Sequence, residues 1–180
     1  MLDKGMERVV PALPSVTLSP RAAQKLRLYV ELCPYEISGL GEMEVLPAGF
    51  QVRDLHLLKQ RCSASYTELL PDGVARFLIS YLEQGGDPAV LKLWWHSHGE
   101  MDVFWSPIDD YTAKGFNNDY MLSLVANKEG DHLCRLDLYQ PLKLTLDRLA
   151  VVLPAAATAE AGAMREAVRK EIAEQLIVYV

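Results

Sequence analysis

The sequence predicts an α/β fold, a single three-layer domain in which a mixed β-sheet is flanked by helices. Two observations support this expectation. Segments with the apolar pattern of β-strands alternate along the chain with segments whose apolar residues recur at i, i+3 and i+4, as in helices. The 180 residues are enough for one domain with a full core, and the shares of apolar (50%) and charged (23%) residues are those of a globular protein.

The chain is expected to begin with a loose arm, a strand and a helix. Residues 1–14 contain two prolines and little periodicity, which predicts a flexible N-terminal arm. A short strand is expected over "SVTLSP", in which Ser19 and Pro20 are typical of a helix cap and a first helical position. The helix that follows should end at Cys33, because Pro34 cannot continue it.

The remaining elements follow from the same patterns and from turn residues. In chain order we expect antiparallel strands over 36–46 and 49–58, a helix over 72–84 with Asp72 as its N-cap, a mostly apolar strand over 89–95, a short helix over 106–116, a hairpin over 120–141, a strand over 142–153 and a final helix from about Ala155. The polar segment "KQRCSASY" before the second helix is expected to be a loop, in which Cys62 could be exposed.

These elements define one domain over 15–153, on which a C-terminal helix within 154–180 is expected to pack. The final helix has an apolar stripe with helical spacing, made of Ala161, Met164, Val168, Ile172 and Leu176. A stripe of this kind more often packs on its own domain than on a partner.

The composition argues against several classes of function. The formal charge is −6, with no basic run that could track phosphates, so we expect no nucleic-acid partner. No apolar stretch approaches the roughly 20 residues that span a bilayer, and no apolar core of a signal peptide is present, so we expect no membrane partner and no export. The three cysteines are scattered and odd in number, which favours free thiols and a cytoplasmic location.

The apolar strand expected over 89–95 runs directly into two histidines, His96 and His98. Because side chains alternate along an extended segment, the two imidazoles point the same way and Ser97 points to the opposite face. Two imidazoles on one face can hold a metal ion, and neutral imidazole nitrogen suits zinc. The alternative is a pair of polar residues at the point where a strand leaves the core.

The residues that follow also allow two interpretations. Ser106, Pro107 and Asp109 have the residue types of an N-cap, a first helical position and an acidic first turn, so helix capping alone would explain them. The same turn could instead project the Asp109 carboxylate back onto His96 and His98. Three ligands would leave a fourth tetrahedral position for water, as in catalytic zinc sites. An N-cap serine also keeps its hydroxyl proton free to donate to an oxyanion.

The segment "HSHGEMDVFWSPID" resembles the JAMM motif of the JAB/MPN metalloprotease family, which is His-x-His, seven residues, Ser, two residues and Asp. Seven residues separate His98 from Ser106 and two separate Ser106 from Asp109, so the residue types and both spacings match. The resemblance implies that His96, His98 and Asp109 bind one zinc ion per chain. It also implies that Ser106 stabilises the tetrahedral intermediate.

The family also has a glutamate upstream, at the start of a strand, and "CPYEISGLGEM" is similar to that context with Glu36, Gly39 and Gly41. The resemblance implies that Glu36 holds and deprotonates the catalytic water. The order of strands and helices agrees as well, so the resemblance covers roughly residues 15–150.

Three further residues near the motif call for an interpretation. Asp110 is a rival ligand to Asp109, but a helical step of about 100° turns it away from the direction in which Asp109 points. Phe104 and Trp105 are bulky and look suited to lining a substrate groove. The chain is too short for the long insertions with which some family members grip ubiquitin chains, which leaves the hydrolytic centre untouched.

The resemblance therefore predicts a zinc-dependent isopeptidase or peptidase, similar to the stand-alone prokaryotic members, that cleaves the amide bond after the C-terminal tail of a ubiquitin-like modifier. Its partner would be a ubiquitin-like protein or its conjugate, bound by strand addition. Sulfur-carrier processing is a second reaction with the same chemistry. A non-catalytic MPN-like scaffold is the alternative from another class, although such relatives lose ligands that this chain keeps. A zinc deaminase is disfavoured because no P-C-x-x-C ligand pair is present.

Overall fold

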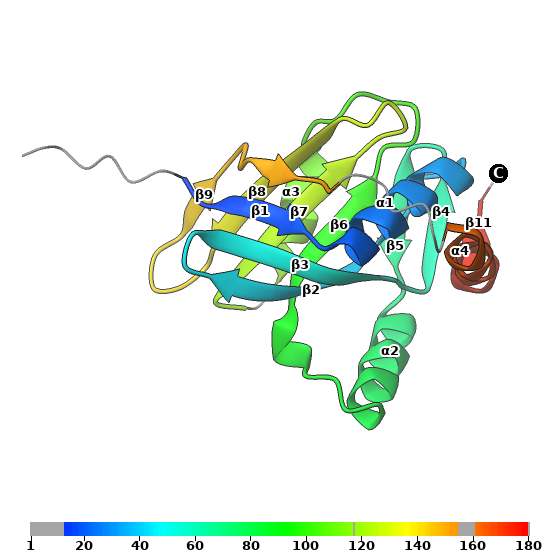
Figure 1. Cartoon of the computed structure of the whole chain (residues 1–180), viewed down its shortest axis with the longest axis horizontal. Coiled ribbons are helices and arrows are strands. Elements are labelled where there is room, and N and C mark those ends of the chain that lie inside the picture. Colours follow the sequence, from blue (N-terminus) through cyan, green and yellow to red (C-terminus); the bar gives the residue numbers. More distant parts are fainter. Residues whose placement is uncertain (1–12, 117, 155–160, 180) are drawn as a thin grey trace, which may run out of the picture.

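An eight-stranded mixed sheet forms the centre of the structure, a computed structural model that describes residues 13–116, 118–154 and 161–179 (Figure 1). Its strands are, in chain order, β1 (Ser15–Leu18), β2 (Ser38–Leu46), β3 (Gly49–Leu57), β6 (Leu91–Ser97), β7 (Tyr120–Ala126), β8 (His132–Leu138), β9 (Leu144–Leu146) and β10 (Val151–Val152). They lie side by side in the order β10-β1-β3-β2-β6-β7-β8-β9. A second sheet has the order β11-β4-β5 and consists of β4 (Gln60–Ser63), β5 (Tyr66–Leu69) and β11 (Leu176–Val178).

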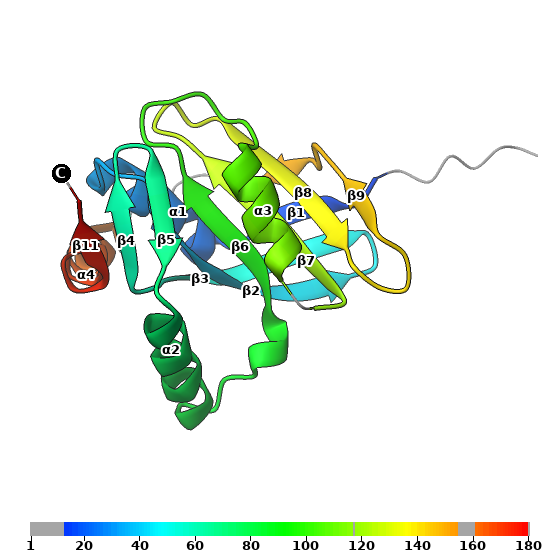
Figure 2. The same cartoon turned by 180° about the vertical axis from the view of Figure 1, so that it is seen from behind.

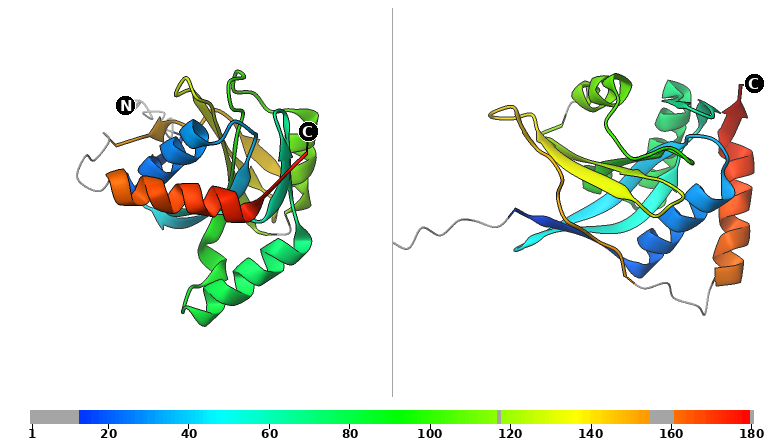
Figure 3. Two further views of the ribbon diagram at one scale, coloured as in Figure 1. Left: turned by 90° about the vertical axis from the view of Figure 1, so that its right-hand side faces the viewer. Right: turned by 90° about the horizontal axis from the view of Figure 1, so that it is seen from above.

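The helices cover both faces of the large sheet. They are α1 (Pro20–Leu32), α2 (Pro71–Glu83), α3 (Pro107–Gly115) and α4 (Ala161–Gln175), with one 3₁₀ turn over Pro88–Val90. α1 lies in front of the sheet in Figure 1 and α3 lies in front of it in Figure 2, so the two occupy opposite faces. Figure 3 shows α4 alongside α1. The domain is thus mixed α/β, as the sequence predicts, and none of the helices in the described ranges is long and apolar enough to cross a membrane.

Capping and proline set where the first two helices begin. Ser19 is the N-cap of α1, as expected, and its hydroxyl accepts a hydrogen bond from the backbone N–H of Ala22 at 3.1 Å. The N-cap expected for α2 was wrong. That helix begins at Pro71, whose fixed φ suits a first helical position, so Leu70 is its N-cap and Asp72 lies inside the first turn.

The segment "KQRCSASY" is not the loop expected from the sequence. It contains β4 and the start of β5, which form a hairpin, and β11 pairs with the other edge of β4. Cys62 is therefore fully buried (0% exposed). Polar residue types hid the strand pattern, since Gln60 is buried as well: its amide hydrogen-bonds to backbone groups of Ser38 and Leu58 and to the hydroxyl of Thr67.

The C-terminal part of the chain also departs from expectation. The single strand expected over 142–153 is two short strands, β9 and β10. Arg148, between them, has a left-handed backbone conformation (φ 55°) that interrupts the extended chain. The described part of α4 begins at Ala161. The start expected near Ala155 and the arm expected over 1–14 fall largely outside the described residues.

The hydrophobic core has two parts, on opposite faces of the large sheet. In the larger part, Trp95 of β6 stacks on Tyr29 of α1 with 5.0 Å between ring centroids, and α4 contributes Val168 to the same cluster. In the smaller part, Trp94 faces the other way and packs in a cluster that Phe77 of α2 also joins. Because β6 is buried on both faces, its strand end is held firmly in place.

The pairing of β2 with β3 and β6 determines what lies beside that strand end. The antiparallel pairing of β2 with β3 is confirmed, and on its other edge β2 runs antiparallel to β6 with Ser38 opposite His96 and Gly39 opposite Trp95. A Cβ atom on Gly39 would lie 1.9 Å from the carbonyl oxygen of His56 and 2.9 Å from Nε1 of Trp95. Only glycine allows so close an approach of the strands.

Gly39→Ala is expected to lower the free energy of unfolding by about 3 kcal/mol or more, because the carbonyl group it meets cannot move aside without breaking the sheet. Urea unfolding followed by circular dichroism measures this. Gly115→Ala, at the end of α3, is the matched control, since no atom lies within 4 Å of its Cβ position. The control should remain within about 0.5 kcal/mol of the wild type. Equal stability of the two variants would contradict the argument.

Candidate metal centre

The two histidines at the end of β6 are buried and face each other. The Nε2 atoms of His96 and His98 lie 3.2 Å apart. Nδ1 of His98 lies 2.8 Å from the carbonyl oxygen of Asp102. Because a carbonyl can only accept, this nitrogen carries the proton, and Nε2 of His98 therefore presents its lone pair to His96. A hydrogen bond on the far ring nitrogen is the usual support of a metal-binding histidine.

The start of α3 brings a carboxylate to the same point. Ser106 and Asp109 form a capping box: the Ser106 hydroxyl accepts from the Asp109 N–H at 3.1 Å, and Oδ2 of Asp109 accepts from the Ser106 N–H at 2.7 Å. The box leaves Oδ1 of Asp109 3.3 Å from Nε2 of His96, while Oδ2 lies 4.0 Å from Nε2 of His98. Ser106 and Asp109 thus cap the helix and at the same time bring a carboxylate close to the histidines.

The geometry of these three residues fits a metal ion. Their ligand atoms all lie within 4.8 Å of one another. A tetrahedral ion with ligands at about 2.0–2.1 Å separates them by about 3.3 Å. Two separations, 3.2 Å between the histidines and 3.3 Å from His96 to Asp109, are close to this value, and the shortest from His98 to Asp109 is longer at 4.0 Å. In addition, Nδ1 of His96 is buried without a hydrogen-bond partner among the described residues. If that nitrogen carries the ring proton, three electron-rich atoms converge, and a cation between them removes their repulsion.

The electrostatics of the site produce the protonation states that metal ligands need. Burial lowers the pKa of His96, so its imidazole is neutral at neutral pH. Burial alone would raise the pKa of Asp109, but in the metal-free site a hydrogen bond from His96, the charge of its protonated form and the hydrogen bonds of Ser106 outweigh burial and lower that pKa to about 2. A bound cation would take the place of the His96 proton in stabilising the ionised carboxylate. Neutral imidazole and ionised carboxylate are compatible with zinc and with other divalent transition metals.

The fourth titratable group near the site is the carboxyl of Glu36, which lies two residues before β2. Its segment is held on two sides: the Glu36 N–H donates to the Ser63 carbonyl at 2.9 Å, and the Ile37 N–H donates to Oγ of Ser97 at 3.1 Å. The Ser97 N–H in turn donates to the carbonyl oxygen of Ile37 at 2.8 Å. Burial, and then the negative charge of Asp109, raise the pKa of Glu36 to about 7.

These groups line one small pocket of about 180 Å³. Glu36, His98, Ser106 and Asp109 all contribute to its wall, and so does Phe104, whose ring is 47% exposed. The β4–β5 hairpin closes another side of the pocket. The pocket therefore joins two of the expected metal ligands, the expected base and the expected oxyanion donor.

Two residues expected near this pocket point elsewhere. Trp105, expected to line the groove, is not among the lining residues, and its indole N–H donates to Oδ1 of Asp147 at 3.1 Å. Asp110 does not compete with Asp109, because its carboxylate pairs with Arg135 at 2.5 Å.

Two residues that position the site were missed at the sequence level. Ser97, the residue between the histidines, anchors the Glu36 segment, and only the alternation of strand side chains hinted that it faces another way. Gln60 ties the β4–β5 hairpin to Ser38, which lies opposite His96. Its polar neighbours in sequence gave no signal of this buried role.

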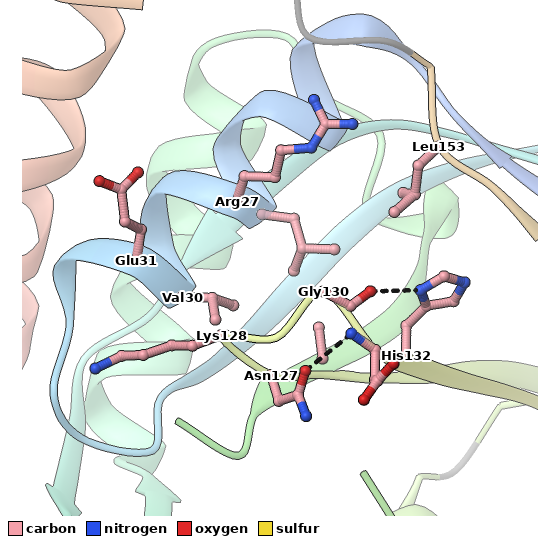
Figure 4. A pocket seen from close by; sticks show the side chains of 11 residues that line it. Arg27, Val30, Glu31, Asn127, Lys128, Gly130, His132 and Leu153 are labelled. Carbon is pink, nitrogen blue, oxygen red and sulfur yellow. Dashed lines mark hydrogen bonds between the residues drawn. The ribbon is translucent and has the colours of Figure 1, made fainter. Parts of the chain in front are cut away.

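A larger pocket of about 500 Å³ lies between α1 and the β7–β8 turn (Figure 4). Three of its charged side chains have partners: Arg27 donates to the carbonyl oxygen of Pro154 at 2.7 Å, Lys128 lies 3.4 Å from a carboxylate oxygen of Glu100, and Glu31 pairs with Arg165 at 2.7 Å. At its edge, Asn127 donates to the carbonyl oxygen of Met101 at 3.1 Å and so ties the turn to the loop after His98. This pocket is therefore connected to the site through the Asn127 hydrogen bond, and none of the expected metal ligands lines it.

No protein-family model and no curated protein matches this chain. The chemistry of the site therefore has to be argued from its own residues.

We expect the protein to bind about one zinc ion per chain, and His96→Ala and His98→Ala to abolish this binding, because two ligands are too few for a stable site. Mass spectrometry of the metal content after dialysis against zinc measures this. His132→Ala is the matched control, since the hydrogen-bond partner of the His132 ring among the described residues is the Gly130 carbonyl of its own turn. Absence of metal uptake by the wild type, or an equal loss in the control, would contradict the assignment.

Zinc affinity is expected to fall as the pH drops below about 6.5, because protons then compete for the imidazoles. Asp109, with a pKa of about 2, stays ionised throughout this range. The lowered pKa of His96 keeps its imidazole neutral at a lower pH than a free imidazole. The zinc affinity should therefore fall steeply only at pH values below about 6.5. Chelator competition at several pH values measures the effect, and a flat affinity would argue against imidazole ligands.

Proposed function

We propose that the protein is a zinc-dependent isopeptidase or peptidase of the JAB/MPN type, acting on the amide bond after the C-terminal tail of a ubiquitin-like modifier. One observation carries this proposal. His98, Asp109, Glu36 and Ser106, which come from three separate segments of the chain, line the same pocket, and His96 lies directly behind them. A mixed sheet with helices on both faces is compatible with the fold of that family.

In the proposed enzyme, His96, His98 and Asp109 would hold the metal. When bound, the ion supplies a Lewis acid that lowers the pKa of a water molecule and polarises a carbonyl oxygen. Asp109 is held on its other side by the Ser106 N–H, so the carboxylate needs no rearrangement to act as a ligand. All three ligand residues are buried, and His98 and Asp109 also line the pocket.

Glu36 is the proposed general base. It is not one of the residues whose ligand atoms converge, which leaves its carboxylate free to take a proton from the attacking water and deliver it to the leaving amine. A pKa of about 7 is close to the optimum for a group that must both accept and donate near neutral pH. The Glu36 carboxyl lines the pocket and makes no side-chain hydrogen bond with the described residues, so it is available for proton transfer there.

Ser106 is the proposed oxyanion donor. Its hydroxyl oxygen accepts the Asp109 N–H, so the hydroxyl proton is not needed for the cap. This proton can turn from the Asp109 carboxylate to an oxyanion in the pocket. A donor fixed before the reaction stabilises the negative charge that develops on the carbonyl oxygen during attack.

The shape of the site favours an extended, small-residue tail as substrate. The pocket has a volume of about 180 Å³ and is bordered by Tyr66 and Thr67 of β5. Within the described residues β5 pairs only with β4, so its outer edge is free to take another strand. Tyr66 of β5 and Phe104 are exposed at the pocket and would flank the bound tail. A sulfur-carrier protein with a similar tail would fit the same site.

Glu36→Gln is expected to keep its zinc and fold but to lower kcat by roughly 10²–10⁴, because an amide cannot accept the proton. The assay uses zinc-loaded protein with a panel of ubiquitin-like fusions and isopeptide conjugates. Glu42→Gln is the matched control, since Glu42 pairs with His56 instead. In the wild type, kcat/KM should rise with pH as Glu36 ionises, at or below its metal-free pKa of about 7. A near wild-type rate in Glu36→Gln with a dead Glu42→Gln would refute this role.

Ser106→Ala is expected to lower kcat by roughly 10²–10³ with unchanged zinc content, because the oxyanion loses its donor. Ser106→Asp separates this role from capping, since an ionised aspartate can cap the helix but cannot donate. If Ser106 acts only as a cap, Ser106→Ala costs about 1 kcal/mol of stability and Ser106→Asp is active. Full activity of Ser106→Asp therefore decides against the catalytic role.

A further inference from the structure

Behind the start of α3 lies a buried arginine that the proposed chemistry does not use. Arg135 is on β8, and its side chain is 8% exposed. Its Nη1 donates to Oδ1 of Asp110 at 2.5 Å and its Nε to Oδ2 of Asp137 at 3.0 Å. Its guanidinium carbon also lies 4.5 Å from the ring centroid of Trp105. Arg135 therefore contacts two residues of the loop and helix that carry the site, and one residue of its own strand.

The two contacted residues are the sequence neighbours of the functional ones. Trp105 directly precedes Ser106, and Asp110 directly follows Asp109. Because successive helical residues differ by about 100°, Asp110 points to the β8 side while Asp109 points to the histidines. Arg135 thus contacts the residues that precede and follow the Ser106–Asp109 capping box in the sequence.

The indole of Trp105 lies near both Arg135 and a metal ligand. Its ring centroid is 6.0 Å from that of His96 and 4.5 Å from the guanidinium carbon of Arg135. The indole N–H is fixed by Asp147 at 3.1 Å. A shift of this ring would move both the neighbouring Ser106 and the packing of His96.

Arg135 is itself held in place from the sheet. Asp137, which accepts from its Nε, also accepts from the Thr145 hydroxyl of β9 at 2.5 Å. The planar guanidinium can serve several partners in fixed directions, which a lysine cannot. A buried ion pair contributes little net stability compared with apolar packing, so its benefit is more easily explained by fixed geometry.

From these contacts we infer that Arg135 is a positioning residue: together with Trp105 and Asp110 it holds the start of α3 so that Asp109 stays at ligand distance from His96 and the Ser106 hydroxyl stays in the pocket. This inference rests on the proposed function, because it assumes that His96, His98 and Asp109 bind metal. It predicts that substitution of residues that do not bind the metal lowers the metal affinity of the site.

The test measures zinc affinity rather than activity alone. Arg135→Leu could fail to fold, since it leaves Asp137 buried without its cationic partner, so the decisive variants are Asp110→Asn and Trp105→Phe. Asp110 is 46% exposed, and phenylalanine keeps most of the indole packing while removing its N–H. Glu31→Gln is the matched control, because Glu31 forms a similar half-exposed pair with Arg165 at 2.7 Å, far from the site.

Zinc dissociation constants come from competition with a chromophoric chelator, and the ligand geometry from the visible spectrum of the cobalt-substituted protein. Asp110→Asn and Trp105→Phe should raise the zinc Kd roughly 10- to 100-fold and alter the cobalt spectrum, while their melting temperatures stay close to that of Glu31→Gln. Asp110→Glu, which can still reach Arg135, should recover much of the affinity.

Unchanged zinc Kd values and cobalt spectra in both variants would overturn the inference. So would a loss of affinity that only accompanies a large drop in melting temperature. If the wild type binds no zinc, the inference fails together with the proposed function. If it binds zinc but cleaves no conjugate, the proposed reaction fails, while the Kd ratios still decide the role of Arg135.

Discussion

The register of β2 against β6 sets Ser38 opposite His96, and the rest of the site is arranged around this pairing. It depends on Gly39, where a side chain would collide with the carbonyl of the next strand. The pairing brings the segment before β2 alongside the end of β6, where Ser97 hydrogen-bonds it in place. As a result, Glu36 and the histidines meet although sixty positions separate Glu36 from His96.

The pKa values of two carboxyl groups in this small space are shifted in opposite directions. The neighbouring imidazole and the capping hydrogen bonds lower the pKa of Asp109 to about 2, whereas burial beside that charge raises the pKa of Glu36 to about 7. A permanently ionised carboxylate suits a metal ligand, and one that titrates near neutrality suits a proton carrier. This separation of pKa values supports the division of roles in the proposed peptidase.

Much of the site could be predicted because its signals are local. Strand alternation placed His96 and His98 on one face, and residue types typical of an N-cap and first turn located Ser106 and Asp109. The hairpin of β4 and β5 could not be predicted in this way. Its buried residues include Gln60, whose amide is satisfied by distant backbone groups, so no apolar alternation marks the strand. The same limit hid Arg135, whose partners lie on α3 and on the loop before it.

The sequence by itself determined the α/β class, the starts of α1 and α3, and the residue types and spacing of the candidate metal site. These features depend on backbone periodicity and on hydrogen bonds between residues only a few positions apart. Only the tertiary structure decided that the capping carboxylate also faces His96, that Glu36 shares its pocket, and that Trp105 packs behind the site rather than in the groove. Such contacts depend on strand register and side-chain packing between distant segments, and no local pattern along the chain encodes them.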